Sequence, residues 1–368
     1  MKHTDAVSFF ALILIIITSV GLMNHVIIIP ALLESAGRDA WVSVICACLV
    51  ALIWVPLIYF ITKKTKQENL YLWLSRSVGK GVAAVIVGAI SVYLLVLATV
   101  TIIDLSEWTV ITYLPRTPSI VIVIVFSVLC FLAAITNLRT IATINGILLP
   151  VVIVFGLFVM LANEPNKDYS LLQPVLERGF DPSIYYGMIY SGAGLVEIIV
   201  ILFIQHKVKP SIKLVPILLT TAFLATLTLG PLIGAIVEFG PAEAARQRFP
   251  AYEEWALVTI GRFIEHVDFL SIYQWLTGAF IRITFLLFLV PEIFNVHQPK
   301  KRAQLLAVFF SLMIAMTLIP RKDFQFLFFI STYLLPFSLI FVIALSILLL
   351  TVTFLSKKKG NDATHEIT

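Results

Sequence analysis

Ten apolar runs divide the chain, and they constrain its fold more than any other feature of the sequence. They cover residues 7–33, 41–61, 82–112, 119–136, 141–162, 184–206, 214–238, 270–294, 303–320 and 326–355. About 20 apolar residues in a helix cross the hydrocarbon core of a bilayer. Because 60% of the residues are hydrophobic and only 13% are charged, we predict an all-α integral membrane protein whose surroundings are the lipid bilayer. We expect a single domain of ten transmembrane helices, residues 1–356, followed by a short polar tail, residues 357–368.

The basic residues in the connections between these runs predict the orientation in the membrane. Lys and Arg number 16 on the side that holds both termini and 9 on the other side. Cytoplasmic loops carry an excess of Lys and Arg, so both termini and the polar tail are predicted to be cytoplasmic. The net charge of +5 therefore does not indicate nucleic-acid binding, because the basic residues lie in short loops. Three cysteines lie inside apolar runs, and their spacing matches neither a metal site nor a disulfide framework.

The middle of the sixth run is a poor helix in an otherwise apolar segment. It reads Tyr190-Ser191-Gly192-Ala193-Gly194-Leu195-Val196-Glu197. Each glycine costs a helix interior roughly 1 kcal/mol relative to alanine, and broken backbone is tolerated in a membrane only where protein or a water-filled cavity satisfies it. We predict an interruption near Ser191–Gly194. The alternative is that Gly192 and Gly194 only allow another helix to pack closely.

The first run has a similar middle. It contains Thr18, Ser19, Val20 and Gly21, followed by Asn24, His25 and Pro30. The first and sixth runs are corresponding members of two five-helix halves, which cross the membrane in opposite directions. Matched interruptions in inverted halves indicate a substrate site at mid-membrane. The sequence therefore predicts a 5+5 inverted repeat, with interruptions at Thr18–Gly21 and Ser191–Gly194.

A small-molecule site is predicted where the two interruptions meet. Helix N-termini near Gly21 and Leu195 suit a carboxylate, and the carbonyl groups of helices ending near Thr18 and Tyr190 suit an ammonium, so a small zwitterion fits both. The candidate ligand-binding residues in the two interruptions are Thr18, Ser19, Gly21, Tyr190, Ser191, Gly192 and Gly194. The sequence shows no nucleophile, no set of metal-ligating residues and no acid–base pair near these positions, so we do not expect an enzyme or a cofactor.

Two ionisable residues, Glu197 and Arg282, lie near the centres of their apolar runs and complete the candidate site. A charged group at the centre of a membrane helix costs roughly 2.5–3.5 kcal/mol, so both should face the interior and find partners. Two interpretations stay open. They pair with each other for structural reasons, or Glu197 meets a substrate ammonium. For His25, a hydrogen-bonded packing role is expected.

Two predictions concern the outer surface. Asp104 and Glu107 share one helix face at the end of the third run, where a solvated helix end is expected, with a gating or proton-linked role as the alternative. The long connection 238–268 is predicted to form a short helix at Ala242–Arg248 and a second one at Ala251–Ile264. A connection of this length is typically a functional lid or a partner surface, and a loosely packed loop is the alternative.

Several short motifs resemble the spore germination permease family, the B subunits of the GerA-type germinant receptors of spore-forming Bacilli. The first are Gly21, Pro30 and the run Ala36-Gly37-Arg38-Asp39-Ala40-Trp41. The others are Val78-Gly79-Lys80, Leu114-Pro115-Arg116-Thr117-Pro118, Leu172-Gln173-Pro174, Gly230-Pro231 and Phe249-Pro250. Each is weak alone, but their order covers nearly the whole chain. Asn137 and Thr143 depart from the pattern, since Gly and Arg are expected there.

The resemblance implies a ten-helix bundle related to the amino acid–polyamine–organocation transporters, with a LeuT-like inverted repeat. It further implies a subunit that recognises a nutrient germinant, such as an amino acid, in the spore inner membrane, with its termini on the spore-core side. The partners implied are the A and C subunits of the receptor. A sensor that signals by conformational change, a proton-coupled amino-acid transporter acting through Glu197 or Asp104, and an ion-release pore all remain possible on this fold.

Overall fold

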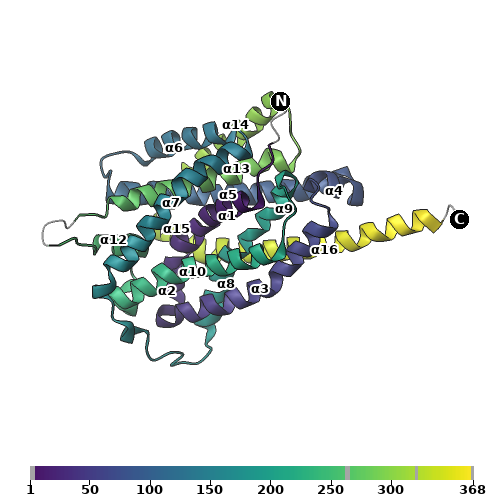
Figure 1. Cartoon of the computed structure of the whole chain (residues 1–368). Coiled ribbons are helices and arrows are strands. Elements are labelled where there is room, and N and C mark those ends of the chain that lie inside the picture. Colours follow the sequence, from purple (N-terminus) through teal and green to yellow (C-terminus); the bar gives the residue numbers. More distant parts are fainter. Residues whose placement is uncertain (1–4, 262–265, 320–321, 366–368) are drawn as a thin grey trace.

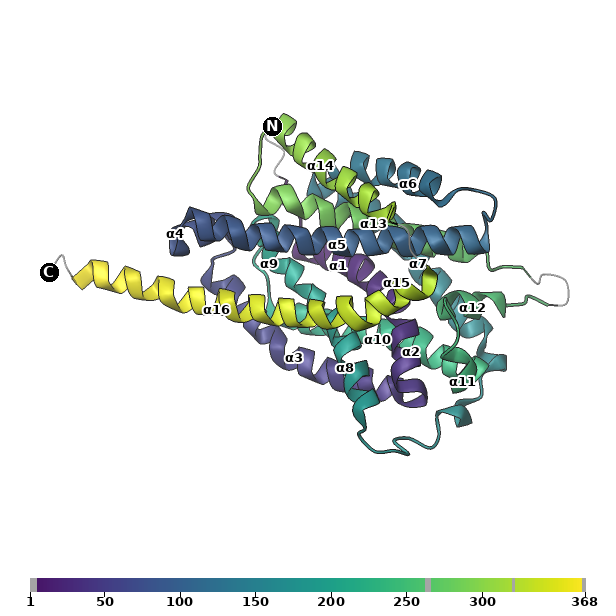
Figure 2. The same cartoon turned by 180° about the vertical axis from the view of Figure 1, so that it is seen from behind.

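The computed structural model describes residues 5–261, 266–319 and 322–365, with side chains up to residue 355. Its regular elements are α-helices (α) and short 3-10 or π-helical segments (η), and an isolated β-bridge joins Val7 and Val208. The helices form one bundle, with α11 and α12 at one end and α4 and the C-terminal part of α16 at the other (Figures 1 and 2).

Each of the ten apolar runs is helical. In the first five runs, the helices are α1 (Phe9–Leu22), η1 (Met23–Ile27) and α2 (Ile29–Ala36), then α3 (Ala40–Lys64), α5 (Lys80–Thr112), α6 (Ser119–Ala134) and α7 (Leu138–Ala162). In the last five, they are α8 (Pro182–Leu195), η5 (Val196–Ile199) and α9 (Val200–Ile204), then α10 (Leu214–Phe239), α13 (Leu270–Ile293), α14 (Pro299–Thr317), and α15 (Asp323–Phe329), η7 (Ile330–Leu334) and α16 (Leu335–His365). The connections hold η2 (Gly37–Asp39), α4 (Leu70–Val78), η3 (Glu164–Asn166), η4 (Tyr169–Leu172), η6 (Gln205–Lys207), α11 (Pro241–Ala244) and α12 (Pro250–Ala256).

The all-helical membrane fold is confirmed at a coarse level. Within the described ranges, seven helical segments are long and apolar enough to cross a membrane, and the first of them, Phe9–Lys64, contains two of the apolar runs. Helix α6 is a shorter apolar helix. The count of ten crossings and the domain boundary at residue 356 stay predictions. Helix α16 continues to His365, so the first part of the expected polar tail is helical.

Local side-chain caps explain where several helices begin. Asn137 accepts a hydrogen bond from the backbone N–H of Thr140 at 3.0 Å and caps α7. Asp181 caps α8 in the same way, through the N–H of Ser183 at 2.9 Å, and Pro182 follows at the first helical position. Such caps satisfy N–H groups that have no helical partner. Asn137, one of the two departures from the family pattern, therefore has a local structural role.

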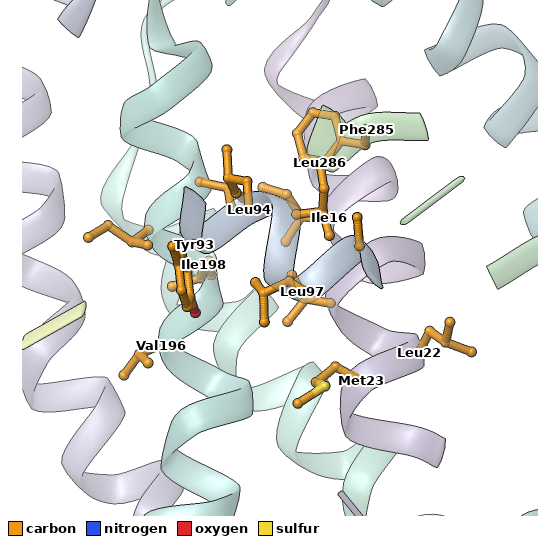
Figure 3. Packing of buried hydrophobic residues seen from close by; sticks show 14 of the residues in the cluster. Ile16, Leu22, Met23, Tyr93, Leu94, Leu97, Val196, Ile198, Phe285 and Leu286 are labelled. Atoms are coloured by element: carbon orange, nitrogen blue, oxygen red, sulfur yellow. The ribbon is translucent and has the colours of Figure 1, made fainter. Parts of the chain in front are cut away.

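The centre of the bundle is built by the first, third, sixth and eighth apolar runs. In α13 and in the segment from α8 to η6, most residues are buried. Ile16 of α1, Leu97 of α5, Ile198 of η5 and Phe285 of α13 belong to one hydrophobic cluster (Figure 3). Because lipid is as apolar as these side chains, close packing rather than exclusion from water holds such helices together.

The helical irregularities in the first and sixth runs lie about one turn beyond the predicted positions. Thr18–Gly21 and Ser191–Gly194 are regular α-helix, so the expected interruptions there were wrong. Pro30 has no N–H to bond the carbonyl four residues earlier, and the π-helix η1 lies directly before it, where the N–H of Ile28 bonds to the carbonyl of Met23 at 3.1 Å. The expected half-helix ends at Gly21 and Tyr190, with their free backbone groups, are therefore absent from these described segments.

In the sixth run, the irregularity is a tightening of the helix. The 3-10 segment η5 follows Leu195, and the N–H of Val196 is shared between the carbonyls of Gly192 and Gly194. Short 3-10 segments of this kind are frequent at the ends of α-helices. Both runs thus contain a non-α segment near their middle, but neither is unwound.

The long connection 238–268 forms two short helices, α11 and α12, which are shorter than predicted. Helix α12 ends at Ala256, so the expected continuation to Ile264 was wrong at least as far as Gly261, and Arg262 to Ile264 lie outside the described residues. Trp255 of α12 is buried against Phe155 and Phe158 of α7 and donates to Gln274 of α13 at 2.9 Å. The segment is therefore packed on the bundle, and the alternative of a loose loop is excluded for α12.

Candidate functional site

The two ionisable residues predicted for the middle of the bundle form a buried ion pair. Arg282 Nη1 lies 2.6 Å from Glu197 Oε2, and Arg282 Nη2 lies 2.9 Å from Glu197 Oε1. Their side chains are 0% and 1% exposed. A two-pronged contact of this kind uses the planar guanidinium fully and gives strong, directional hydrogen bonds. The geometry agrees with the structural interpretation of the pair.

Arg282 also bonds to two other helices. Its Nη1 donates to the backbone carbonyl of Ser19 in α1 at 2.8 Å, and its Nε donates to Thr101 Oγ1 in α5 at 3.0 Å. The guanidinium of α13 therefore holds η5, α1 and α5 in one register. A buried charge is tolerated when its hydrogen bonds are satisfied in this way.

The irregular end of α1 explains why the carbonyl of Ser19 is available to Arg282. The N–H of Met23 donates to the carbonyl of Val20, one residue short of the α-helical partner at Ser19. The carbonyl of Ser19 accepts from Arg282 instead. The change from α1 to η1 and the ion pair are thus two parts of one arrangement.

The glycines of the two runs are sites of close helix packing. A Cβ atom at Gly194 would lie 1.9 Å from Asn24 Oδ1, so the π-helix η1 packs directly on α8 at this point. A Cβ at Gly21 would lie 3.2 Å from Leu227 of α10, and one at Gly192 would lie 3.5 Å from Leu339 of α16. The packing interpretation of the small residues therefore accounts for Gly194 and, less strictly, for Gly21.

Asn24 is the unusual side chain at this contact. It is 0% exposed, and neither its Nδ2 nor its Oδ1 has a hydrogen-bond partner among the described residues. The Ser191 hydroxyl of α8, which is 1% exposed, also lacks a partner there. Buried polar groups are normally paired, and each exception asks for an explanation such as a ligand or a water molecule. Asn24 was noticed in the sequence only as part of the polar interruption of the first run.

The other predicted site residues do not join this centre. The Thr18 hydroxyl donates to the carbonyl of Leu14 in its own helix at 3.1 Å. Tyr190 is buried in α8, and none of the hydrogen bonds of the described residues joins it to the ion pair. His25 Nδ1 lies 2.8 Å from the carbonyl of Leu227, which confirms a hydrogen-bonded packing role. Ligand binding by Thr18 and Tyr190 stays a prediction.

A cavity of about 270 Å³ opens elsewhere, between α1 and α7. Its walls are Leu14, Gly146, Leu149, Pro150 and Ile153. These side chains are apolar and include neither Asn24 nor the ion pair. The cavity therefore does not fit a zwitterion and is not the candidate site.

Arg248, in the outer connection between α11 and α12, binds three carboxylates. Its Nη2 lies 3.1 Å from Asp104 Oδ1 and 3.5 Å from Glu107 Oε2, and its Nε lies 2.9 Å from Asp323 Oδ1. Its guanidinium also lies over the ring of Phe249, 4.3 Å from the centroid. Asp104 is only 2% exposed, so the expected solvated helix end was wrong.

The substitution Arg248→Gln is expected to loosen the outer connection and to lower the free energy of unfolding by about 2 kcal/mol, the magnitude typical of hydrogen bonds to charged groups. The carboxylate of Asp104 would stay buried without its cation. Thermal unfolding of the purified protein and limited proteolysis in the connection would measure the effect. Arg246→Gln, at an exposed position of the same connection, is the matched control. An equal effect in both variants would contradict the role of the Arg248 ion pairs in holding the connection on the bundle.

Two partners in these networks carried no distinctive sequence signal. Thr101 is one of many hydroxyl residues in apolar helices, where such side chains usually bond to their own helix, as Thr101 also does through Leu97. Arg248 lies in a connection with other basic residues, and its three acidic partners come from distant parts of the chain.

Comparison with known proteins identifies relatives along almost the whole chain. The sequence model of a family described as spore germination protein matches residues 6–326. Spore germination protein XB of Bacillus anthracis is 46% identical over 353 residues, which are 96% of this chain and 99% of that protein. The YfkT protein of Bacillus subtilis (strain 168) is 27% identical over 275 residues, 74% of each chain.

Among solved structures, the fold resembles that of Mhp1, a nucleobase-cation-symport-1 family transporter, determined in a closed conformation with bromovinylhydantoin bound. The TM-score is 0.57 at 15% identity, covering 89% of this chain and 77% of Mhp1. At this identity the likeness concerns the fold alone. With a family match over most of its length and a close relative that it spans almost from end to end, the chain belongs to the spore germination protein family.

Proposed function

We propose that the protein is the nutrient-recognition subunit of a GerA-type germinant receptor and that its ligand is a small zwitterion such as an amino acid. The observation that carries the proposal is the contact of η1 with α8 at Asn24 and Gly194, directly beside the central ion pair. In this proposal ten helices cross the spore inner membrane as a LeuT-like 5+5 inverted repeat, with both termini on the spore-core side. Family membership and the transporter-like fold support it.

The ligand site in this proposal lies between η1 and α8. The unpartnered carboxamide of Asn24 offers a donor and an acceptor, and the Ser191 hydroxyl offers another of each. A ligand with an ammonium and a carboxylate can use both kinds of group. Glu197 and Arg282 keep each other and the carbonyl of Ser19 in place, so they position the site rather than bind the ligand by themselves.

Signalling follows from the close contact of these two segments. Because Gly194 and Asn24 touch, a ligand between them requires η1 and α8 to move apart. A ligand that binds the separated state shifts the population toward it. We propose that the A and C subunits of the receptor respond to this shift.

The alternative function is an amino-acid transporter, which the fold of Mhp1 favours. The two functions differ in one measurable quantity. Purified protein in liposomes should take up labelled amino acids if it transports them. Loss of germination in spores that lack the chain, together with no uptake by liposomes, would favour the sensor, whereas uptake at the concentrations that trigger germination would favour the transporter.

The substitution Asn24→Ala is expected to raise the amino-acid concentration needed for half-maximal germination by about 10-fold or more, the equivalent of a lost hydrogen bond to a charged group. The protein should still fold, because the carboxamide has no protein partner among the described residues. Germination dose–response in spores, with the abundance of the protein measured alongside, tests this.

Asn145→Ala is the matched control for that experiment. Asn145 in α7 is also 0% exposed, and both of its side-chain polar atoms lack partners among the described residues. Its neighbour in sequence, Gly146, lines the apolar cavity, and Asn145 takes no part in the hydrogen bonds that Glu197 and Arg282 form. A normal dose–response in Asn24→Ala spores, or an equal shift in both variants, would contradict the proposal that the ligand binds at η1.

A further inference from the structure

A second group of buried polar side chains lies at the outer end of the bundle, away from the ion pair. Glu254 of α12 is 8% exposed, and its carboxyl group rests on α10. A Cβ atom at Gly234 would lie 2.8 Å from the carboxyl carbon and from both oxygens of Glu254. The carboxyl group of Glu254 therefore occupies a place on the backbone of α10 that only a glycine leaves open.

Asn163 connects the backbone of Glu254 to a second acidic residue, Glu238. At the end of α7, its Nδ2 donates to the backbone carbonyl of Glu254 at 2.6 Å and to Glu238 Oε2 of α10 at 3.2 Å. Asn163 is 0% exposed, and its Oδ1 has no hydrogen-bond partner among the described residues. The end of α7 is thus joined through Asn163 to both α10 and α12.

The two carboxyl groups are not neutralised by a direct partner. Oε1 of Glu238 and Oε1 of Glu254 are buried and lack hydrogen-bond partners among the residues with described side chains. The nearby cation is Lys167, whose Nζ bonds to the carbonyl of Met160 at 2.7 Å and to Glu164 Oε2 at 3.1 Å. Two buried like charges that share a site cannot both remain ionised at low cost.

We propose that Glu238 and Glu254 form a proton-binding pair that holds one proton at neutral pH and thereby fastens α12 to α10. Protonation of one carboxyl group removes the repulsion between the two acids and the cost of burying a second charge. A proton requires no space, which suits the tight packing at Gly234. The described residues contain no group of three or more His, Cys, Asp and Glu side chains able to hold a metal ion.

The surroundings support this assignment. Burial and then the negative charge of Glu238 raise the pKa of Glu254 well above its ordinary value, and Lys167 opposes the rise. The other charged group near the pair is Glu164, which adds negative charge. Helix α12 also contacts η1, whose His25 is bonded to the carbonyl of Leu227. The protonation state of the pair is therefore placed to influence both the outer connection and η1.

Infrared spectroscopy of the purified full-length protein in lipid tests the pair directly. The wild-type protein is expected to show a protonated carboxylic acid band at neutral pH that disappears as the pH is raised. Glu254→Gln should lack this band. Glu238→Gln should still show the band, but the band should disappear at a lower pH than in the wild type, because the neighbouring negative charge is gone. Glu243→Gln, at an exposed position in α11, should leave the band unchanged.

Stability against pH gives a second, independent readout. A carboxyl group whose pKa is raised by folding stabilises the protein below its unfolded pKa, and this stability is lost as pH rises through the folded pKa. The wild-type melting temperature should therefore fall as the pH rises from the ordinary glutamate range through the raised pKa of Glu254 in the folded protein. Because an amide resembles the protonated acid, Glu254→Gln should abolish at least about half of that fall.

Two results would overturn the proposal. The first is a neutral-pH band that persists in both Glu254→Gln and Glu238→Gln. The second is a melting temperature that rises with NaCl or KCl, relative to choline chloride at equal ionic strength, in the wild type and not in Glu254→Gln. That second result would identify the group as a metal-cation site. If Glu254→Gln does not fold, the shifted titration in Glu238→Gln still decides the matter.

Discussion

Glu197→Gln is expected to lower the free energy of unfolding by about 3–5 kcal/mol, the usual cost of leaving one member of a buried ion pair without its partner. The guanidinium of Arg282 would remain 0% exposed with a neutral neighbour in place of the carboxylate. Its bonds to Ser19 and Thr101 do not supply a negative charge. Thermal unfolding of the purified protein and its abundance in membranes are the measurements.

A matched control is available in a surface ion pair of the same charge type. Glu177 pairs with Arg38 at 3.5 Å, and its side chain is 68% exposed. Exposed pairs contribute about 0–1 kcal/mol, so Glu177→Gln should change stability very little. If Glu197→Gln were as stable as Glu177→Gln, the buried pair would not have the structural role that its geometry indicates.

The double variant Glu197→Gln with Arg282→Met separates the two interpretations of the pair. Removing both charges should restore much of the lost stability, since apolar replacement of a whole buried pair is often nearly neutral. Recovery of stability together with germination would identify a structural pair. Recovery of stability without germination would identify a role of the pair toward the ligand.

The second large effect is expected at Gly194. Gly194→Ala should destabilise the protein by about 3 kcal/mol, at the upper end of the usual cost of overpacking. The new Cβ would lie 1.9 Å from Asn24 Oδ1 and 3.0 Å from Asn24 Cγ, and the Asn24 side chain is enclosed. Either η1 or α8 must move, and the ion pair of Glu197, which lies in η5 directly after α8, would be disturbed as well.

A second substitution can relieve this clash. Because the atoms in the way belong to the side chain of Asn24, Gly194→Ala combined with Asn24→Ala should regain most of the stability that Gly194→Ala loses. Thermal unfolding rather than germination is the readout, since Asn24→Ala alone is expected to impair the response to nutrient. Failure of the double variant to recover would mean that backbone, and not Asn24, limits the space at Gly194.

Gly88→Ala is the control for this experiment. Gly88 lies inside α5, and a Cβ there would meet no atom within 4 Å. An alanine in a helix interior is favoured over glycine by about 1 kcal/mol, so this variant should be as stable as the wild type or more stable. A loss at Gly88 similar to that at Gly194 would point to a general sensitivity of the helices.

Several features could be predicted from the sequence because they depend on composition along the chain. Long apolar runs have few conformational options in a bilayer, since a helix satisfies all of its backbone groups internally. The central positions of Glu197 and Arg282 likewise required an interior location and a partner, and the structure brings them together. The unusual middle of the first run predicted an interruption at Thr18–Gly21, whereas the structure has regular helix there and a π-helical segment at Met23–Ile27.

The position and form of that departure could not be predicted. The Gly and hydroxyl residues at Thr18–Gly21 and Ser191–Gly194 suggested breaks, but the helix continues through both because neighbouring helices fill the space beside the glycines. Whether a glycine breaks a helix or allows close packing depends on the neighbouring surface, which belongs to a distant part of the sequence. For Gly194, that surface is Asn24.

The acidic residues at the outer end show the same limit. Asp104 lies near the end of a long apolar helix, where the sequence predicts exposure to solvent. In the structure, Arg248, 144 positions along the chain, binds its carboxylate. Asn163, at the end of another helix, bonds to Glu238 and to the backbone carbonyl of Glu254, and the carboxyl group of Glu254 packs on Gly234 of α10. The sequence by itself determined that the chain forms membrane helices and that its central charges must be paired, because burial in lipid allows little else. Which distant groups meet at Arg282, Asn24, Arg248 and Glu254 was decided by tertiary packing alone, since hydrogen bonds and close contacts depend on distances that the order of residues does not specify.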